Sequence, residues 1–133
     1  MNNQNYEKSG LIIFSHGSKR ASSINQILQL TECMKQNLSQ RFSHVNAAFL
    51  EFAQPNLLQA VAEHHNLGME NVVVFPYFLT PGKHVESDIP EEMEKIKAQY
   101  SRLRLSCAPF MASHPNWNSI MTSVILDHVN QAH

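Results

Sequence analysis

Val72-Val73-Val74-Phe75-Pro76 is the stretch that decides the fold, because four consecutive β-branched or aromatic residues favour a buried strand. A second apolar run, Leu11-Ile12-Ile13-Phe14, is closed by Ser15-His16-Gly17 and predicts a strand that enters a turn. Residues 45–50 predict another short strand. Residues 102–107 alternate polar and apolar side chains, which is typical of a half-exposed edge strand.

Segments with apolar residues at helical spacing follow each of these strands. The predicted helices are residues 21–41, a helix with Pro55 in its first turn that ends at Gly68, a helix with Asp88 and Glu91 as its N-cap pair, and a last helix opened by Pro115. Strands that alternate with helices predict a single α/β domain over residues 10–133, behind a polar tail of residues 1–9. We expect a four-stranded parallel sheet of flavodoxin-like order with helices on both faces.

Composition and net charge restrict the kinds of molecule that the protein is expected to bind. The chain has 133 residues and a mass of 15.1 kDa, with 43% hydrophobic and 16% charged residues, as in an ordinary globular domain. A formal charge of −1 argues against a nucleic-acid partner, and no apolar run approaches the ~20 residues that span a bilayer. The polar first ten residues lack the apolar stretch of a signal peptide, so we expect a cytoplasmic protein without a membrane partner. Two distant cysteines without a CxxC pairing argue against a disulfide framework and against a closed Cys-type zinc site.

Ligands of open parallel sheets bind at the carboxyl ends of the strands, and this rule sorts the histidines. His16, Glu51, His84 and His114 follow the four predicted strands, and His84 is expected in the loop after the third. A single loop histidine often only hydrogen-bonds a turn, so the prediction rests on the convergence of imidazoles with a carboxylate. These groups bind Fe, Co, Ni or Zn and leave coordination positions open, which suits a transient ion.

Other histidines belong to the opposite edge and are assigned no function; they are His44, His64 and His65. The last two lie near a predicted helix C-terminus, where the helix dipole favours a cation.

The residues after His16 predict a site for an anionic, planar ligand. Ser18, Lys19 and Arg20 begin the first predicted helix, whose backbone N–H groups attract anions. Gly17 and Gly82 permit close approach of a bulky ring. The segment lacks the GxxxxGK pattern of a phosphate loop.

Four segments of the chain carry a resemblance to a known family: residues 12–18 (IIFSHGS), 48–51 (AFLE), 76–90 (PYFLTPGKHVESDIP) and 113–115 (SHP). In these segments the chain resembles the CbiX/SirB-type sirohydrochlorin chelatases, in their short single-domain form. The resemblance covers residues 10–130. It implies the chelatase-like α/β fold and insertion of a divalent metal ion into sirohydrochlorin. Longer relatives carry two copies of this unit, so one copy here implies a homodimer.

By the same resemblance, His16 and His84 would handle the metal and Glu51 would be the acidic helper. The ion, Co²⁺, Fe²⁺ or Ni²⁺, would be a substrate, and no organic cofactor is implied. The substrate-binding residues would be Ser18, Lys19, Arg20, Gly82 and Lys83. Relatives often have an acidic pair where Lys19 and Arg20 stand, which leaves the role of the position after Ser18 open.

Two other functions would also use a histidine after the first strand, and the residue before His16 disfavours the first of them. A histidine phosphatase requires Arg before its phosphorylated His, and this chain has Ser15 there. A non-catalytic carrier of metal or tetrapyrrole would use the same ligands, and the sequence does not separate it from a chelatase. Nor does it decide which metal is used.

Overall fold

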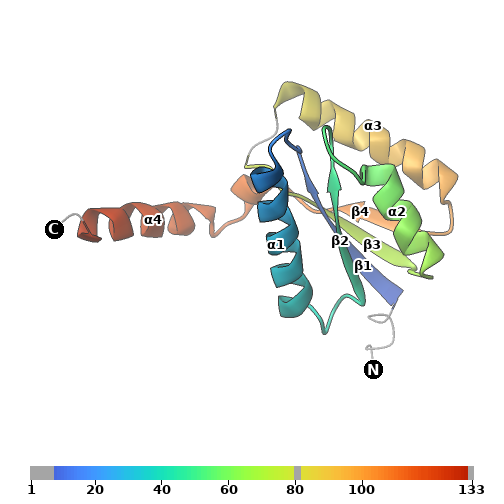
Figure 1. The fold of residues 1–133 in the computed structure, drawn as a ribbon, viewed down its shortest axis with the longest axis horizontal. Helices are drawn as coiled ribbons and strands as arrows, with labels where there is room; N and C mark the ends of the chain where they lie inside the picture. The colour runs from blue at the N-terminus through green and yellow to red at the C-terminus, as the bar shows by residue number, and fades with distance from the viewer. Residues whose placement is uncertain (1–7, 80–81, 132–133) are drawn as a thin grey trace.

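The computed structural model describes residues 8–79 and 82–131, apart from the side chains of Lys83 and His84. Strands and helices alternate along the chain (Figure 1). The elements are β1 (Ser9–Ser15), α1 (Ala21–Asn37), β2 (His44–Phe49), α2 (Leu57–Asn66), β3 (Asn71–Pro76), α3 (Lys83–Gln99), β4 (Arg104–Cys107), a 3-10 turn (Met111–Ser113) and α4 (Trp117–Gln131).

The four strands form one parallel sheet in the order β2-β1-β3-β4. The flavodoxin-like order and the edge position of β4 are therefore confirmed. β1 lies inside the sheet, and its Phe14 is in register with Ala48 of β2 and Pro76 of β3. The carboxyl ends of these three strands consequently meet at one edge.

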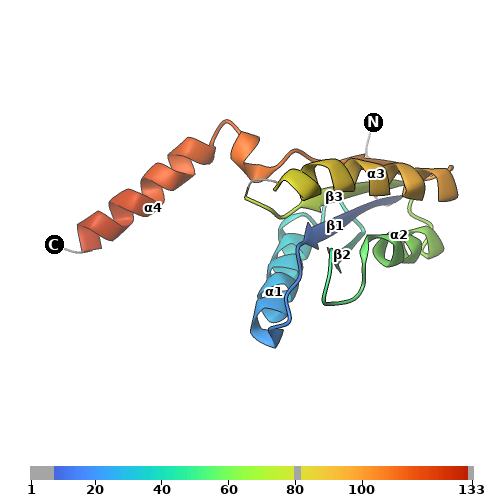
Figure 2. The ribbon, with the colours of Figure 1, turned by 90° about the horizontal axis from the view of Figure 1, so that it is seen from above.

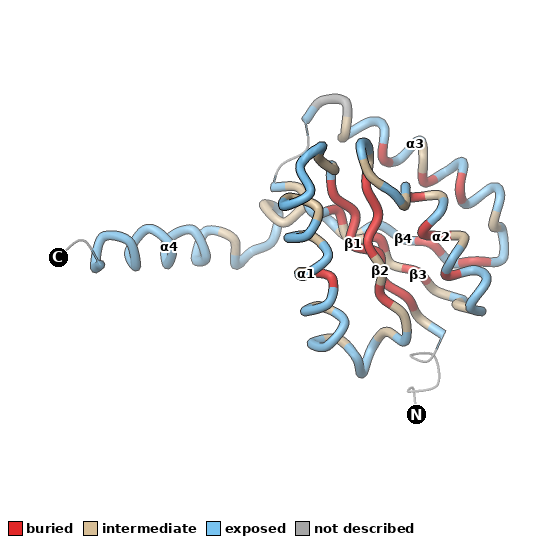
Figure 3. The backbone as a smooth tube through the Cα atoms, viewed as in Figure 1, coloured by how far each residue is buried: buried red, intermediate tan, exposed pale blue. Residues whose placement is uncertain are grey.

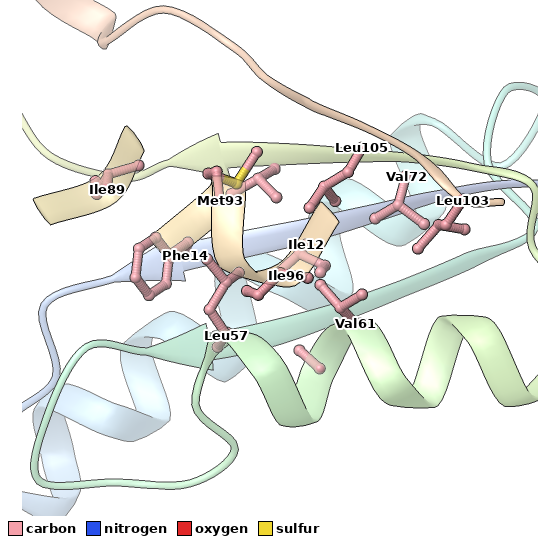
Figure 4. Packing of buried hydrophobic residues seen from close by; sticks show 13 residues of the cluster. Ile12, Phe14, Leu57, Val61, Val72, Ile89, Met93, Ile96, Leu103 and Leu105 are labelled. Atoms are coloured by element: carbon pink, nitrogen blue, oxygen red, sulfur yellow. The ribbon is translucent and has the colours of Figure 1, made fainter. Parts of the chain in front are cut away.

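One face of the sheet carries the main core. Ile12, Phe14, Val72 and Val74 pack against α2 and α3, and each is at most 1% exposed (Figure 4). α3 contributes Ile89, Met93 and Ile96, and α2 contributes Leu57, Ala60 and Val61. Burial of these aliphatic side chains is the main favourable term in folding.

The other face is covered by α1, which packs mainly on β2 and β1. Leu11, Ile13 and Val45 form a smaller cluster there with the half-buried apolar side of α1. Thr31 is the one buried residue of α1, and the rest of this helix is half-buried or exposed (Figure 3). Helices on both faces were predicted, but the last helix is an exception: α4 extends away from the sheet (Figures 1 and 2).

Three helix starts differ from the prediction, and one of them is that of α4, which begins at Trp117, two residues after Pro115. α3 begins at Lys83 with Gly82 as its N-cap, so Asp88 lies inside the helix and is not its cap. α2 begins at Leu57, because Asn56 accepts a hydrogen bond from the Gln59 N–H and forms a capping box. Pro55 thus precedes the helix and does not stand in its first turn. Within the described ranges, no helix is long and apolar enough to cross a membrane.

Candidate functional site

His16 and Glu51 lie together at the carboxyl edge of the sheet. His16 directly follows β1 and Glu51 follows β2 by two residues, so the pairing of these strands brings them side by side. His16 Nε2 is 3.9 Å from Glu51 Oε2, and the two side chains are 56% and 50% exposed. An imidazole and a carboxylate at this separation, both open to solvent, are available to bind an ion or exchange protons.

The main chain holds these two residues together. The Glu51 N–H donates to the His16 carbonyl at 3.0 Å, and the Leu50 N–H donates to the Ser15 carbonyl at 2.9 Å. Gly17 has a φ of +96°, and a Cβ there would lie 1.9 Å from the Glu51 carbonyl oxygen. Gly17 was expected to make room for a planar ligand; the structure shows that it makes room for the neighbouring loop.

Aromatic side chains lie beside His16, and the sequence patterns did not predict them. The Phe78 ring stands edge-on to His16, at a centroid distance of 6.4 Å, and also packs against Phe14 and Phe110. Tyr77 and Leu79, on either side of Phe78, are exposed. The sequence does contain a signal for these side chains: residues 77–79 are apolar although they directly follow a strand, where polar residues are usual.

A hollow of about 230 Å³ opens between His16 and the first turns of α1. It is lined by Ser15, Gly17, Ser18, Ile24, Ile27 and Tyr77, among others. The Ser15 hydroxyl is buried beside His16 and has no hydrogen-bond partner among the described residues.

The predicted substrate-binding residues occupy the starts of two helices. Ser18 Oγ accepts a hydrogen bond from the Arg20 N–H at 3.0 Å, which fixes the turn into α1. Lys19 Nζ lies 5.2 Å from the centroid of the Phe52 ring, a cation–π contact. Gly82 is the exposed N-cap of α3. The side chain of Lys83 lies outside the described residues.

His84 is in the first turn of α3 and not in a loop, so its expected position is corrected. Its side chain lies outside the described residues, and the expected closeness to His16 stays a prediction. Among described side chains, no three His, Cys, Asp or Glu residues converge as a metal-binding group. His114, expected at the same edge, accepts a hydrogen bond at Nδ1 from the Asn116 N–H.

At the opposite end of β1, His64 is fully buried, which the sequence did not reveal. Burial, together with the neighbouring His44, lowers the pKa of His64 to about 4. It is therefore neutral at pH 7, and the helix-dipole explanation for a cation there is wrong. His64 Nε2 lies 2.9 Å from Asn46 Oδ1, while His44 pairs with Glu63. His65 is exposed and packs against Tyr100 with the two rings tilted by 47°, so it stays without an assigned function.

Comparison with known families and proteins adds to this geometry. The CbiX family model matches residues 10–128. The "Sirohydrochlorin cobaltochelatase" of Methanococcus maripaludis is 33% identical over 82 residues, 61% of this chain and 55% of that protein. The chloroplastic "Sirohydrochlorin ferrochelatase" of Arabidopsis thaliana is 28% identical over 121 residues, 91% of this chain and 49% of that protein. The chain thus spans about half the length of these two relatives.

Solved structures show the same fold. A putative cobalamin biosynthesis CbiX protein from Marinobacter aquaeolei VT8 superposes with a TM-score of 0.79 at 23% identity, covering 92% of this chain and 98% of that one. The sirohydrochlorin chelatase SirB from Bacillus subtilis subspecies spizizenii, in complex with cobalt, gives a TM-score of 0.71 at 23% identity, covering 77% of this chain and 43% of that one.

Proposed function

The chain belongs to the CbiX family, and from that premise we propose that it inserts a divalent metal ion into sirohydrochlorin. Relatives named for cobalt insertion and for iron insertion both match this chain, which supports Co²⁺ or Fe²⁺ as the ion. Ni²⁺ has the same preference for imidazole and carboxylate and is the third candidate. The ion is a substrate, and the proposal includes no organic cofactor.

The observation that carries this proposal is the exposed pair of His16 Nε2 and Glu51 Oε2, 3.9 Å apart. Insertion exchanges one M²⁺ for two pyrrole protons, while the ion loses its water ligands. His16 offers a nitrogen ligand that holds the ion at the sheet edge; Glu51 accepts one of the two protons that the ring releases, and the second passes to solvent water. Both steps need side chains open to a large substrate, as these two are.

A second histidine completes the proposed metal-handling set. α3 begins at the carboxyl edge of the sheet, seven residues after the end of β3, and the backbone of His84 lies in its first turn. We propose that the side chain of His84 lies opposite that of His16, so that the two imidazoles hold the ion between them.

The macrocycle is proposed to lie on the apolar residues around His16. Phe78, Tyr77, Leu79 and Phe52 offer flat or apolar surface at this edge, and the last three are between 38% and 55% exposed. Lys19 and Arg20, at the start of α1, are the described cations closest in sequence to His16 and would meet the carboxylates of the substrate. Ser18, Gly82 and Lys83 are the other residues proposed to bind the substrate.

We also propose that the working form is a homodimer with this site near the subunit boundary. The match to the Arabidopsis ferrochelatase takes up 91% of this chain but only 49% of that protein, so a second copy would supply the other half. Closed two-fold pairing is the commonest arrangement of such homo-oligomers.

Turnover separates a chelatase from a carrier. Purified protein is mixed with a 50-fold excess of sirohydrochlorin and of Co²⁺ or Fe²⁺ under anaerobic conditions, and the absorbance change of the ring is followed. A chelatase converts many equivalents per chain above the rate without protein. A carrier stops after about one equivalent, and that result would contradict the proposal.

A further inference from the structure

Phe52 has a backbone conformation that is unusual for a residue of its kind. Its φ is +69°, and among the residues that the structure describes it is the one non-glycine residue with a positive φ. The left-handed region brings the Cβ of an L-residue close to a carbonyl oxygen, so bulky residues rarely adopt it. Residues in this conformation persist where the surrounding structure holds them, and they cluster at functional sites.

The place of Phe52 in the chain singles it out further. The described residues with a positive φ are Gly17, Phe52 and Gly68. Gly17 directly follows His16, and Phe52 takes the equivalent place after Glu51. Gly17 adopts the left-handed conformation without strain, because it has no Cβ. Glycine would make the same turn at position 52 without strain, so the phenylalanine found there points to a role for its ring.

The turn at Phe52 belongs to a loop that the main chain closes between β2 and α2. The Phe49 N–H donates to the Pro55 carbonyl at 2.8 Å, so the chain reverses between these two residues. Glu51 lies inside the closed loop, and its N–H donates to the His16 carbonyl at 3.0 Å. A residue at position 52 that rejects a positive φ would shift the point of reversal and move Glu51 away from His16.

The ring of Phe52 lies at the surface and is 55% exposed, so its burial adds little to the stability of the core. It contacts the other loop of the site, since Lys19 Nζ lies 5.2 Å from the ring centroid. None of the ion pairs in the described part of the chain includes Lys19. The aromatic face therefore holds this ammonium group but leaves its charge uncompensated. An incoming carboxylate meets the cation without displacing a carboxylate of the protein.

We infer that Phe52 is a positioning residue with two separate tasks. Its left-handed backbone directs Glu51 to His16, and its ring holds the Lys19 ammonium where a carboxylate of the macrocycle arrives. The inference rests on the proposed function, because it assigns a group of the substrate to one cation of the site. The backbone task affects the rate of insertion, whereas the ring task affects the binding of the metal-free macrocycle.

Three substitutions separate the two tasks. Phe52→Gly permits the positive φ but removes the ring, Phe52→Val removes the ring and disfavours the positive φ, and Phe52→Tyr keeps the ring. The Kd of metal-free sirohydrochlorin is measured by absorbance titration, kcat by turnover, and the midpoint of thermal unfolding by circular dichroism. Leu67 is the matched control position, because it is also 55% exposed but has an ordinary φ of −85°, at the opposite edge of the sheet.

Loss of the ring is expected to weaken binding. Phe52→Gly should raise the Kd of the metal-free macrocycle about 10-fold and change kcat less than about 3-fold, and Lys19→Met should raise the Kd by a similar factor. The two changes combined should raise the Kd little further, because the ring acts through the cation. Phe52→Tyr should keep the wild-type Kd, because it keeps the aromatic face.

Loss of the positive φ is expected to slow insertion. Phe52→Val should lower kcat about 10-fold, and Glu51→Gln should lower it little further in this background, because Glu51 is already displaced. The unfolding midpoint gives a reading without substrate. Phe52→Gly should raise the midpoint by about 3 °C as the strain is relieved, whereas Leu67→Gly should lower it, because glycine gains freedom in the unfolded chain. Leu67→Gly and Leu67→Val should both keep the wild-type Kd and kcat.

Three outcomes would overturn the inference. Additive effects of Phe52→Gly and Lys19→Met on the Kd would mean that the ring does not act through the cation. Equal kcat values for Phe52→Gly and Phe52→Val would mean that the backbone conformation does not position Glu51. A midpoint lowered equally by glycine at positions 52 and 67 would mean that the left-handed turn is not strained.

Failure of the proposed function gives a different result. A wild-type chain that binds the macrocycle but does not turn it over would contradict metal insertion, while the Kd and the unfolding midpoints would still support or overturn the two tasks of Phe52.

Discussion

The two ends of β1 use the same residue types for opposite purposes. At the carboxyl end, His16 lies 3.9 Å from Glu51, and both side chains are about half exposed. At the amino end, His64 is 0% exposed and His44 pairs with Glu63. At the carboxyl end, Gly17 permits the close approach of the Glu51 main chain, and at the amino end, Gly10 permits that of the His64 ring. The difference is burial: an open imidazole is free to bind and release, whereas a buried one with a pKa of about 4 is held neutral as part of the core.

The largest effect is expected from Gly10→Ala at the buried end. A Cβ on Gly10 would lie 2.1 Å from His64 Nδ1, so the imidazole must leave its place in the core. We expect a loss of about 4 kcal/mol or more in the free energy of unfolding, measured by urea denaturation, as for other disruptive core changes.

Two controls sharpen this comparison. Gly82→Ala, where nothing lies within 4 Å of the new Cβ, is expected to cost less than about 1 kcal/mol. Gly10→Ala combined with His64→Ala is expected to be more stable than Gly10→Ala alone, because the smaller side chain removes the clash. A double variant as unstable as the sum of its parts would show that His64 is not the obstacle.

The next effect is the pH dependence of stability from His64. Its folded-state pKa of about 4 lies below the ordinary 6.5, so the unfolded chain binds more protons between these values. The contribution is fully present above pH 6.5 and is lost as pH falls towards 4, by about 3 kcal/mol at 1.36 kcal/mol per pKa unit.

Urea unfolding of wild type and His64→Gln at pH 7, 5.5 and 4.5 measures how steeply the free energy of unfolding falls with pH. His64→Gln is expected to be less stable at pH 7 but to lose less stability on acidification. Parallel slopes in the two proteins would assign the acid sensitivity to other groups. His65→Ala, which removes an exposed histidine one residue away, should keep the wild-type slope.

At the open end, His16→Ala is expected to lower the rate of metal insertion about 100-fold, which is about 2.7 kcal/mol in activation free energy. The side chain is 56% exposed, so the midpoint of thermal unfolding should change little. Insertion is followed by the absorbance of the ring. His65→Ala, at the other end of the sheet, should keep full activity; a comparable loss there would contradict the assignment of the site to the carboxyl edge.

The smallest effect is expected from Glu51→Gln, which keeps the shape of the side chain but removes its ability to accept a proton. We expect about a 10-fold lower insertion rate, because water at this exposed position takes over part of the role. Glu63→Gln is the matched control at the buried end and should leave the insertion rate unchanged. A larger loss in Glu51→Gln than in His16→Ala would reverse the two proposed roles.

The strand order and the closeness of His16 to Glu51 could be predicted, because both follow from apolar periodicity and from the rule on strand ends. The start of α3 could not, since Asp88 and Glu91 are a strong local capping signal whereas Gly82 is a weak one. Periodicity showed which side of α4 is apolar but not what covers it. The burial of His64 arises from its approach to Gly10, distant in sequence, which no local pattern reports.

The main-chain hydrogen bond from the Glu51 N–H to the His16 carbonyl fixes the backbone of the site independently of the side chains that carry its chemistry. The spacing of the two Cα positions is inherited from neighbouring strands, about 4.8 Å apart, and does not depend on the side chains attached. Either position can therefore be exchanged for a softer or harder ligand without moving the loops. Under the proposed function, single substitutions on this fixed backbone would adjust the preference among cobalt, iron and nickel.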